Sequence, residues 1–130
     1  MCSSDLFPSH DKRVVWTLAA WEIYEFTGDK AWLQKAYEIA SNSVIDDEKI
    51  VFDPETGLMR GESSFLDWRE QTYPNWMEPS DIYASLNLGT NAVYYQVLSV
   101  LSNMAGELQI HNNWGKKAAD LKEKIGRAHV

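Results

Sequence analysis

Apolar and polar positions along the chain predict four helices. Residues 12–27 are apolar on almost every side, and between Val14 and Phe26 the polar exceptions are Thr17, Glu22 and Glu25. Such a helix is buried by neighbours around most of its circumference. Gly28 supplies a C-terminal stop, and Asp29 is suited to capping the start of a second helix.

The second helix is predicted over residues 30–45 and is apolar along one side only. Its apolar positions, spaced three and four residues apart, are Leu33, Ala36, Tyr37, Ala40 and Val44. Polar and charged side chains occupy most of the other positions. This pattern is typical of an amphipathic helix at the surface of a domain.

The helical period is lost between residues 46 and 89. We expect a short β-hairpin here, with strands at 49–53 and 58–62 joined by a turn that contains Pro54 and Gly57. Residues 63–89 then form a long loop rich in aromatic residues, prolines and charges. Loops of this length are uncommon inside compact domains and are often functional.

A third helix is predicted over about 91–108, with Thr90 or Asn91 as its cap and apolar side chains around most of its circumference. A fourth begins near Asn113 and places three apolar residues on one face: Trp114, Ala118 and Leu121. Buried helices thus alternate with surface helices, and a long loop separates the two pairs. This order predicts an all-α fold, namely part of an (α/α)6 toroid with about two helical hairpins. A plain helical bundle or repeat array is the alternative, but it needs no long aromatic loop.

The toroid also predicts how the helices pack. The helices at 14–26 and 92–105 should be the most buried and should lie side by side, because both are apolar nearly all round. Residues 30–45 should pack outside them. A second helix sandwiched between the other two would contradict this arrangement.

The two ends of the chain carry a separate signal. The opening string Met-Cys-Ser-Ser-Asp-Leu and the closing string Ile-Gly-Arg-Ala-His-Val resemble translations of a common sequencing adapter, read on opposite strands. We therefore interpret residues 1–6 and 125–130 as adapter-derived and leave them out of the fold prediction. Residues 7–124 are then an open portion of one larger helical domain.

Composition narrows the class of function. The formal net charge of −7 and the lack of a basic patch argue against nucleic acid as a partner. No apolar run approaches the roughly 20 residues that a membrane span needs. Cys2 is the only cysteine, and His10 and His111 have no partner at ligand spacing, so no metal or other cofactor is expected. No signal peptide is visible, and the composition does not distinguish cytoplasmic from periplasmic or secreted enzymes.

The most specific motif is the stretch at 57–70, which reads Gly-Leu-Met-Arg-Gly-Glu-Ser-Ser-Phe-Leu-Asp-Trp-Arg-Glu. It resembles the catalytic-acid segment of six-hairpin glycosidases, which include trehalases, processing α-glucosidases, mannosylglycerate hydrolases and the glucosidase domain of glycogen-debranching enzymes. Trehalases have Glu-Ser-Gly-Trp-Asp, one residue shorter before the Asp. The triplet at 65–67 matches the aromatic-Met-Asp triplet of debranching enzymes.

Two further stretches resemble the same superfamily. Residues 88–95 resemble the start of the next inner helix, and residues 24–33 resemble a corner between helices that is common in these enzymes. The resemblance covers most of residues 12–124 and implies a partial (α/α)-barrel glycosidase domain over 7–124. The run at 69–76 fits no single member family.

The resemblance implies that Asp67 is the general acid. Glycoside hydrolysis needs two carboxyl groups that flank the scissile bond, and the acid must hold its proton. The aromatic residues next to Asp67 suit that role, because burial among them disfavours the charged form. The alternative is a structural Asp67 that caps a helix or pairs with Arg69. In the relatives the second carboxylate comes from a later hairpin, so we expect it outside this chain.

Five residues are candidate substrate ligands: Glu62, Trp68, Arg69, Trp76 and Asn91. Glu62 and Arg69 would hold sugar hydroxyls, with a mutual ion pair as the alternative. Trp68 and Trp76 would stack on sugar faces, with core packing as the alternative. Asn91 would bind a hydroxyl or cap its helix.

The predicted function is that of a glycosidase cleaving the O-glycosidic bond of an oligosaccharide or small glycoside. The resemblance implies an α-linked glucoside or mannoside and an inverting mechanism, and the chain alone is expected to be inactive. A non-catalytic helical carbohydrate-binding or interaction domain is the second hypothesis, with Asp67 exposed or structural. A polysaccharide lyase is the third, but it requires a Tyr or His base, and no Tyr–His pairing is evident.

Overall fold

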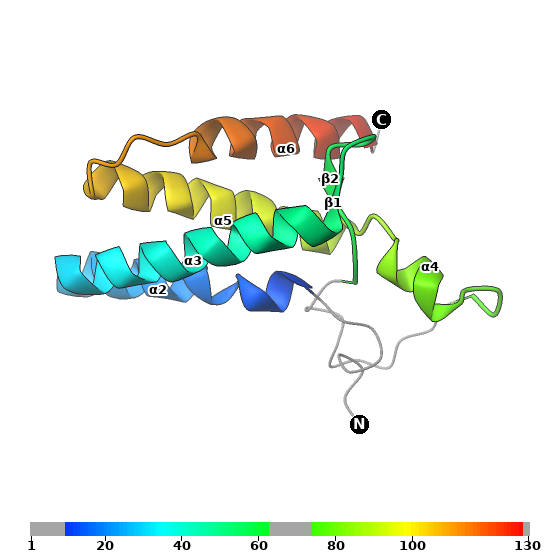
Figure 1. Ribbon diagram of the computed structural model, residues 1–130, viewed down its shortest axis with the longest axis horizontal. Helices are drawn as coiled ribbons and strands as arrows, with labels where there is room; N and C mark the ends of the chain where they lie inside the picture. Colours follow the sequence, from blue (N-terminus) through cyan, green and yellow to red (C-terminus); the bar gives the residue numbers. More distant parts are fainter. Residues whose placement is uncertain (1–9, 63–73, 129–130) are drawn as a thin grey trace, which may run out of the picture.

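The computed structural model describes residues 10–62 and 74–128, which are mostly helical. In chain order its elements are the 3-10 helix η1 (His10–Arg13), α2 (Trp16–Thr27), α3 (Lys30–Val51), β1 (Phe52–Asp53), β2 (Leu58–Met59), α4 (Pro79–Tyr83), α5 (Leu88–Glu107) and α6 (Trp114–Ala128). The long helices lie alongside one another, with α5 between α6 and the α2–α3 pair (Figure 1). The predicted all-α class, with two helical hairpins and a short β-hairpin, is confirmed.

The corner of the first helical hairpin has the predicted chemistry. Gly28 ends α2 with a left-handed φ of 68°, and its N–H donates to the Tyr24 carbonyl at 2.7 Å. Asp29 caps α3, because its Oδ1 accepts from the backbone N–H groups of Ala31 and Trp32 at 3.0 and 3.1 Å. The Gly–Asp pair therefore places the two helices antiparallel.

Helix α3 runs to Val51, six residues beyond the predicted end. The extension continues the same buried stripe, because Asp47 and Val51 follow Val44 at helical spacing and are fully buried. The strand predicted at 49–53 is therefore reduced to the two residues of β1, which pair antiparallel with β2. Asp47 is charged and therefore interrupts the apolar pattern, so the pattern did not predict that the helix continues beyond residue 45.

The turn between β1 and β2 is built as predicted. Gly57 has a φ of 75°, and its N–H donates to the Asp53 carbonyl at 2.7 Å. The Thr56 hydroxyl donates to the Asp53 carboxylate at 2.8 Å and is the main reason that the pKa of Asp53 lies below its usual range. Arg60 also pairs with this carboxylate, at 3.3 Å.

Helix α5 begins at Leu88, and its cap is Asn87 rather than Thr90 or Asn91. The Asn87 Oδ1 accepts from the backbone N–H groups of Gly89 and Thr90 at 2.8 and 3.4 Å. The predicted cap was therefore wrong by about one turn. As a result, Thr90 and Asn91 lie inside the first turn of the helix, where both are buried.

The predicted arrangement of the three helices is confirmed, but the prediction that α2 is among the most buried helices is wrong. Helix α2 contacts α5 directly, and α3 packs against both, so α3 is not sandwiched between them. Ten of the 20 residues of α5 are buried, against three of the 12 residues of α2. Helix α2 is less buried than expected because Ile23 and Phe26, at 46% and 94% exposed, face away from the described core.

A short helix, α4, interrupts the long loop predicted at 63–89. Pro79 occupies its first position, and the Asp81 carboxylate accepts from the Glu78 N–H at 2.9 Å. Proline followed two residues later by aspartate is a helix-start signal that the sequence interpretation missed. The loop is therefore shorter than predicted.

Helix α6 begins near the predicted position, and the Asn112 Oδ1 accepts from the Trp114 N–H at 2.9 Å. Its three predicted apolar residues are each 5% exposed and belong to the core. The helix continues through Ala128, and Ile125 packs against the core while partly buried. The adapter origin of residues 1–6 and 125–130 stays a prediction, and residues 1–6 lie outside the described part of the chain.

Exposed apolar side chains gather on α2 and on one side of α3. Trp32, Ile39 and Ile50 of α3 are 38%, 48% and 49% exposed, and spacings of seven and eleven residues place them on one side of the helix. Ile23 and Phe26 add to the apolar surface on α2. Exposed apolar side chains that line up along one side of a helix often mark a contact with another protein surface.

We expect the 130-residue chain to self-associate through this surface as its concentration rises. Replacing Ile23 and Phe26 with serine should shift sedimentation velocity profiles toward the monomer, because it removes apolar area that association would cover. Glu22→Ser, an exposed change on the same helix, is the control and should leave the profile unchanged. A wild-type chain that stays monomeric at every concentration would contradict this expectation.

Candidate functional site

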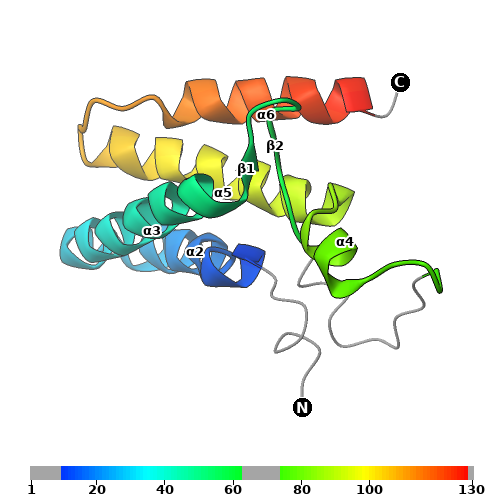
Figure 2. The same ribbon diagram turned by 45° about the vertical axis from the view of Figure 1, so that its right-hand side comes forward.

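The described candidate residues belong to segments at one end of the helical layer. Figure 2 shows the β-hairpin, α4 and the first turn of α5 together at this end. Glu62 follows β2, Trp76 precedes α4 and Asn91 lies in α5. Asp67, Trp68 and Arg69 lie outside the described residues.

Glu62 stands at the point where the chain leaves the hairpin. The preceding residue, Gly61, has a φ of 111°, and its N–H donates to the Ser85 carbonyl at 2.9 Å. Gly61 also forms an isolated parallel bridge with Leu86. These contacts fix the backbone beside Glu62, whose side chain is only 2% exposed. Carboxylates are seldom buried to this extent.

Asn91 is bonded to the backbone rather than open to solvent. Its Oδ1 accepts from the Met59 N–H at 2.7 Å, and its Nδ2 donates to the carbonyls of Met59 and Asn87, both at 2.9 Å. Both amide hydrogens are therefore in use, and the side chain is 2% exposed. A direct hydrogen bond from this amide to a sugar hydroxyl does not fit that arrangement, and Asn91 instead holds β2 against α5.

Trp76 is exposed, unlike the other candidate site residues that the structure describes. Its side chain is 72% exposed, so core packing, the alternative for this residue, is wrong. A large indole that faces solvent at the edge of a site can offer its flat face to a ligand. Trp76 thus keeps the chemistry needed to stack on a sugar.

A buried aspartate that the sequence interpretation missed joins the two helical hairpins. Arg13 of η1 pairs with the Asp47 carboxylate of α3 at 3.1 Å, and the Tyr94 hydroxyl of α5 donates to the same carboxylate at 2.8 Å. Burial, and next the Asp47 carboxylate, raise the pKa of Tyr94 far above its usual value, so the phenol remains a donor. The sequence signal that could have indicated this contact is an aspartate at a position that continues the buried side of α3.

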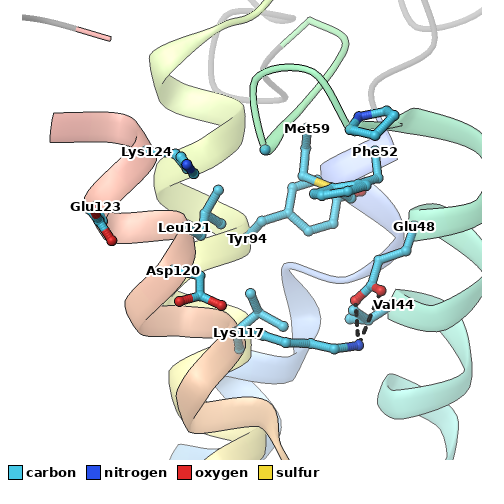
Figure 3. Close-up of a pocket in the computed structure, with 13 residues that line it drawn as sticks. Val44, Glu48, Phe52, Met59, Tyr94, Lys117, Asp120, Leu121, Glu123 and Lys124 are labelled. Carbon is cyan, nitrogen blue, oxygen red and sulfur yellow. Dashed lines mark hydrogen bonds and ion pairs between the residues drawn. The ribbon is translucent and has the colours of Figure 1, made fainter. Parts of the chain in front are cut away.

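A pocket of about 610 Å³ lies between α3, the β-hairpin, α5 and α6 (Figure 3). Its apolar floor includes Tyr94 and Leu121, which are 1% and 5% exposed. At its edge Lys117 pairs with Glu48 at 3.1 Å. Glu62, Trp76 and Asn91 are not among its lining residues. None of the described candidate site residues therefore lines this pocket.

Within residues 10–62 and 74–128, no group of three or more histidine, cysteine or acidic side chains could hold a metal ion. No helix in these ranges is both long and apolar enough to cross a membrane.

Comparison with models of known protein families identifies a match. A family model described as the bacterial alpha-L-rhamnosidase 6 hairpin glycosidase domain matches residues 8–130. Comparison with curated proteins and with solved structures found no match. The matched range contains the described helices and the whole 57–76 segment.

Proposed function

The chain belongs to the family of the bacterial alpha-L-rhamnosidase six-hairpin glycosidase domain, and we propose that its residues 57–76 supply the general-acid side of a glycoside hydrolase active site. The observation that carries this proposal is the family match, which extends over nearly the whole chain. The described residues form two helical hairpins. We propose that further hairpins of an intact six-hairpin enzyme complete the toroid and supply the second carboxylate.

Asp67 is the proposed general acid. Protonation of the leaving oxygen requires a carboxylic acid that keeps its proton until the bond breaks. Phenylalanine and tryptophan on either side of the Leu66–Asp67 pair provide apolar neighbours in the sequence that favour the neutral form. In an inverting enzyme the second carboxylate activates water on the opposite face of the sugar, about 6.5–9.5 Å away.

Glu62, Trp68, Arg69 and Trp76 are the proposed substrate ligands. The low exposure of Glu62 supports a role in the interior of the site, where a carboxylate can accept hydrogen bonds from sugar hydroxyls. The high exposure of Trp76 supports a role at its edge. Asn91 is proposed to act on the backbone of the site rather than on the sugar.

The proposed substrate is a terminal α-linked hexoside. The family description favours an α-L-rhamnoside, and the sequence resemblance favours an α-glucoside or α-mannoside. The test is to assay the enzyme that contains the complete six-hairpin domain with the nitrophenyl α-glycosides of these three sugars. We expect turnover of one of them, with the inverted anomer as the first product in a nuclear magnetic resonance time course. Sugar binding without turnover of any glycoside would instead support the non-catalytic carbohydrate-binding alternative.

Trp76→Ala should weaken substrate binding in this assay. Loss of a stacked ring is expected to raise KM up to about tenfold, equivalent to the ~0.5–1.5 kcal/mol of a good aromatic contact, with a smaller change in kcat. Phe26→Ala is the control, because it removes an aromatic side chain from α2, a helix that carries none of the proposed site residues. Equal KM values for the wild type and both variants would remove Trp76 from the site.

A further inference from the structure

We propose that Thr90 and Asn91 are positioning residues, which bind the backbone of residues 59–61 to the first turn of α5 and thereby set the position of Glu62. This inference rests on the proposed function, because positioning matters only if the 57–76 segment carries the chemistry. Three hydrogen bonds within the described residues support it, and each joins a side chain of α5 to a main-chain atom of Met59 or Gly61.

Asn91 takes the place of a neighbouring strand for β2. The Met59 N–H and carbonyl both bond to the Asn91 amide, at 2.7 and 2.9 Å. On its other edge β2 pairs with β1, and there the Arg60 N–H donates to the Val51 carbonyl at 2.8 Å. Because both edges are occupied, β2 cannot slide relative to α5 without breaking buried hydrogen bonds.

Thr90 holds the chain two residues further on. Its hydroxyl donates to the Gly61 carbonyl at 2.9 Å, and the Gly61 N–H is bound by the Ser85 carbonyl at the same distance. Thr90 is fully buried, so water does not replace this bond easily. Gly61 is therefore fixed through both of its backbone polar groups, at a positive φ that favours glycine.

The two contacts act on one face of a single segment. Met59 and Gly61 lie two residues apart in this segment, and their partners Asn91 and Thr90 are consecutive on the helix. Glu62 follows directly, with a side chain that is 2% exposed. The first turn of α5 thus determines where the chain enters the proposed catalytic segment, and such preorganised placement is what catalytic groups require.

Thr17 offers a matched comparison for Thr90. Both threonines are fully buried in inner helices, but no hydrogen-bond partner lies near the Thr17 hydroxyl among the described residues. Replacing Thr17 with valine preserves its shape and removes no described hydrogen bond. Thr90→Val preserves the shape equally and removes the bond to Gly61, so the difference between the two variants isolates that bond.

The first part of the test uses the 130-residue chain and amide hydrogen exchange. We expect Thr90→Val to speed exchange at Gly61 by about tenfold or more, whereas Thr17→Val leaves it at the wild-type rate. Asn91→Asp keeps the acceptor for the Met59 N–H but loses both donors. If Thr90→Val does not fold, Asn91→Asp replaces it in the test, and the exchange rate measured is that of the Met59 amide.

The second part uses the complete six-hairpin enzyme. Thr90→Val should lower kcat/KM about 10- to 100-fold, through a higher KM as well as a lower kcat, because it displaces Glu62, which is proposed to bind the substrate in both the ground state and the transition state. Thr90→Ser retains the hydroxyl and should restore kcat/KM to within about threefold. Wild-type exchange at Gly61 together with wild-type kcat/KM in Thr90→Val would overturn the positioning role.

Failure of this inference and failure of the proposed function give different results. If Asp67→Asn abolishes turnover but Thr90→Val does not, the acid assignment survives and the positioning role is wrong. If Thr90→Val loses kcat/KM while Asp67→Asn keeps it, the positioning role survives and the acid lies elsewhere. Faster exchange at Gly61 with unchanged kcat/KM would show a purely structural bond and would also overturn the inference.

Discussion

Asp67→Asn in the complete six-hairpin enzyme should lower the turnover of an unactivated glycoside by about 10²- to 10⁴-fold. This is the usual loss when a positioned general acid or base is removed. Substrate binding should survive, because asparagine keeps the shape of the side chain and part of its hydrogen bonding. The measurement is kcat and KM on the glycoside that the wild-type enzyme prefers.

Two controls separate the acid role from a general loss of the site. A glycosyl fluoride needs little protonation of its leaving group, so Asp67→Asn should turn it over at nearly the wild-type rate. Glu62→Gln should instead raise KM as well as lower kcat, because a substrate ligand acts in the ground state and in the transition state. Near wild-type hydrolysis of the unactivated glycoside by Asp67→Asn would show that the acid lies elsewhere.

Leu101→Ala should lower the free energy of unfolding of the chain by about 2–5 kcal/mol. Leu101 is fully buried in α5, the helix that packs against α2, α3 and α6 at once, so truncation leaves a cavity at the centre of the core. Leu88→Ala is the matched control, because Leu88 belongs to the same helix but is 53% exposed. Its effect should stay within about 0.5 kcal/mol.

Urea denaturation of the wild type and both variants checks this difference. It should be done at a concentration low enough to keep the chain monomeric, because the apolar surface on α2 and α3 favours association. The expected result is a lower midpoint for Leu101→Ala with the wild-type slope. Equal midpoints for the two leucine variants would mean that α5 is not the central helix.

The fold was predictable from the sequence where local chemistry and hydrophobic period agree. Gly28 and Asp29 marked the corner between α2 and α3, and Gly57 marked the turn of the β-hairpin; all three act as predicted. The apolar pattern of α3 did not predict the helix beyond residue 45, because the next buried position is Asp47, a charged residue that pairs with Arg13. A pattern of apolar positions contains no information about such a partner.

Burial of α2 could not be predicted from its own sequence. Its apolar circumference predicts neighbours on most sides, but among the described residues Ile23 and Phe26 stay 46% and 94% exposed. The spacing of apolar residues shows which side of a helix is suited to burial. It does not show whether the residues that would bury it belong to the same chain. The same limit explains why the second carboxylate could be expected but not named.

The sequence identified the segment that carries the candidate site, but it predicted the roles of the single residues less well. Glu62 follows Gly61, which is bonded to Thr90 in the first turn of α5, and Trp76 is exposed on the segment before α4, whereas Asn91 proved to bind the backbone of β2. The sequence marks a polar residue in an apolar helix, but only the structure shows that its partner is Met59, 32 residues earlier. Asp67, Trp68 and Arg69 stay predictions from the motif.

The dependence of rate on the leaving group tests the central claim most directly. Values of kcat/KM should be measured for the wild type and Asp67→Asn on a series of aryl glycosides whose phenols span several pKa units. A general acid makes the rate nearly independent of leaving-group pKa, because it donates the proton that a poor leaving group needs. We predict a shallow slope for the wild type and a steep slope for Asp67→Asn, with the two rates converging for the most acidic phenols. Parallel slopes for the two enzymes would contradict the assignment of this segment as the acid side of a glycosidase site.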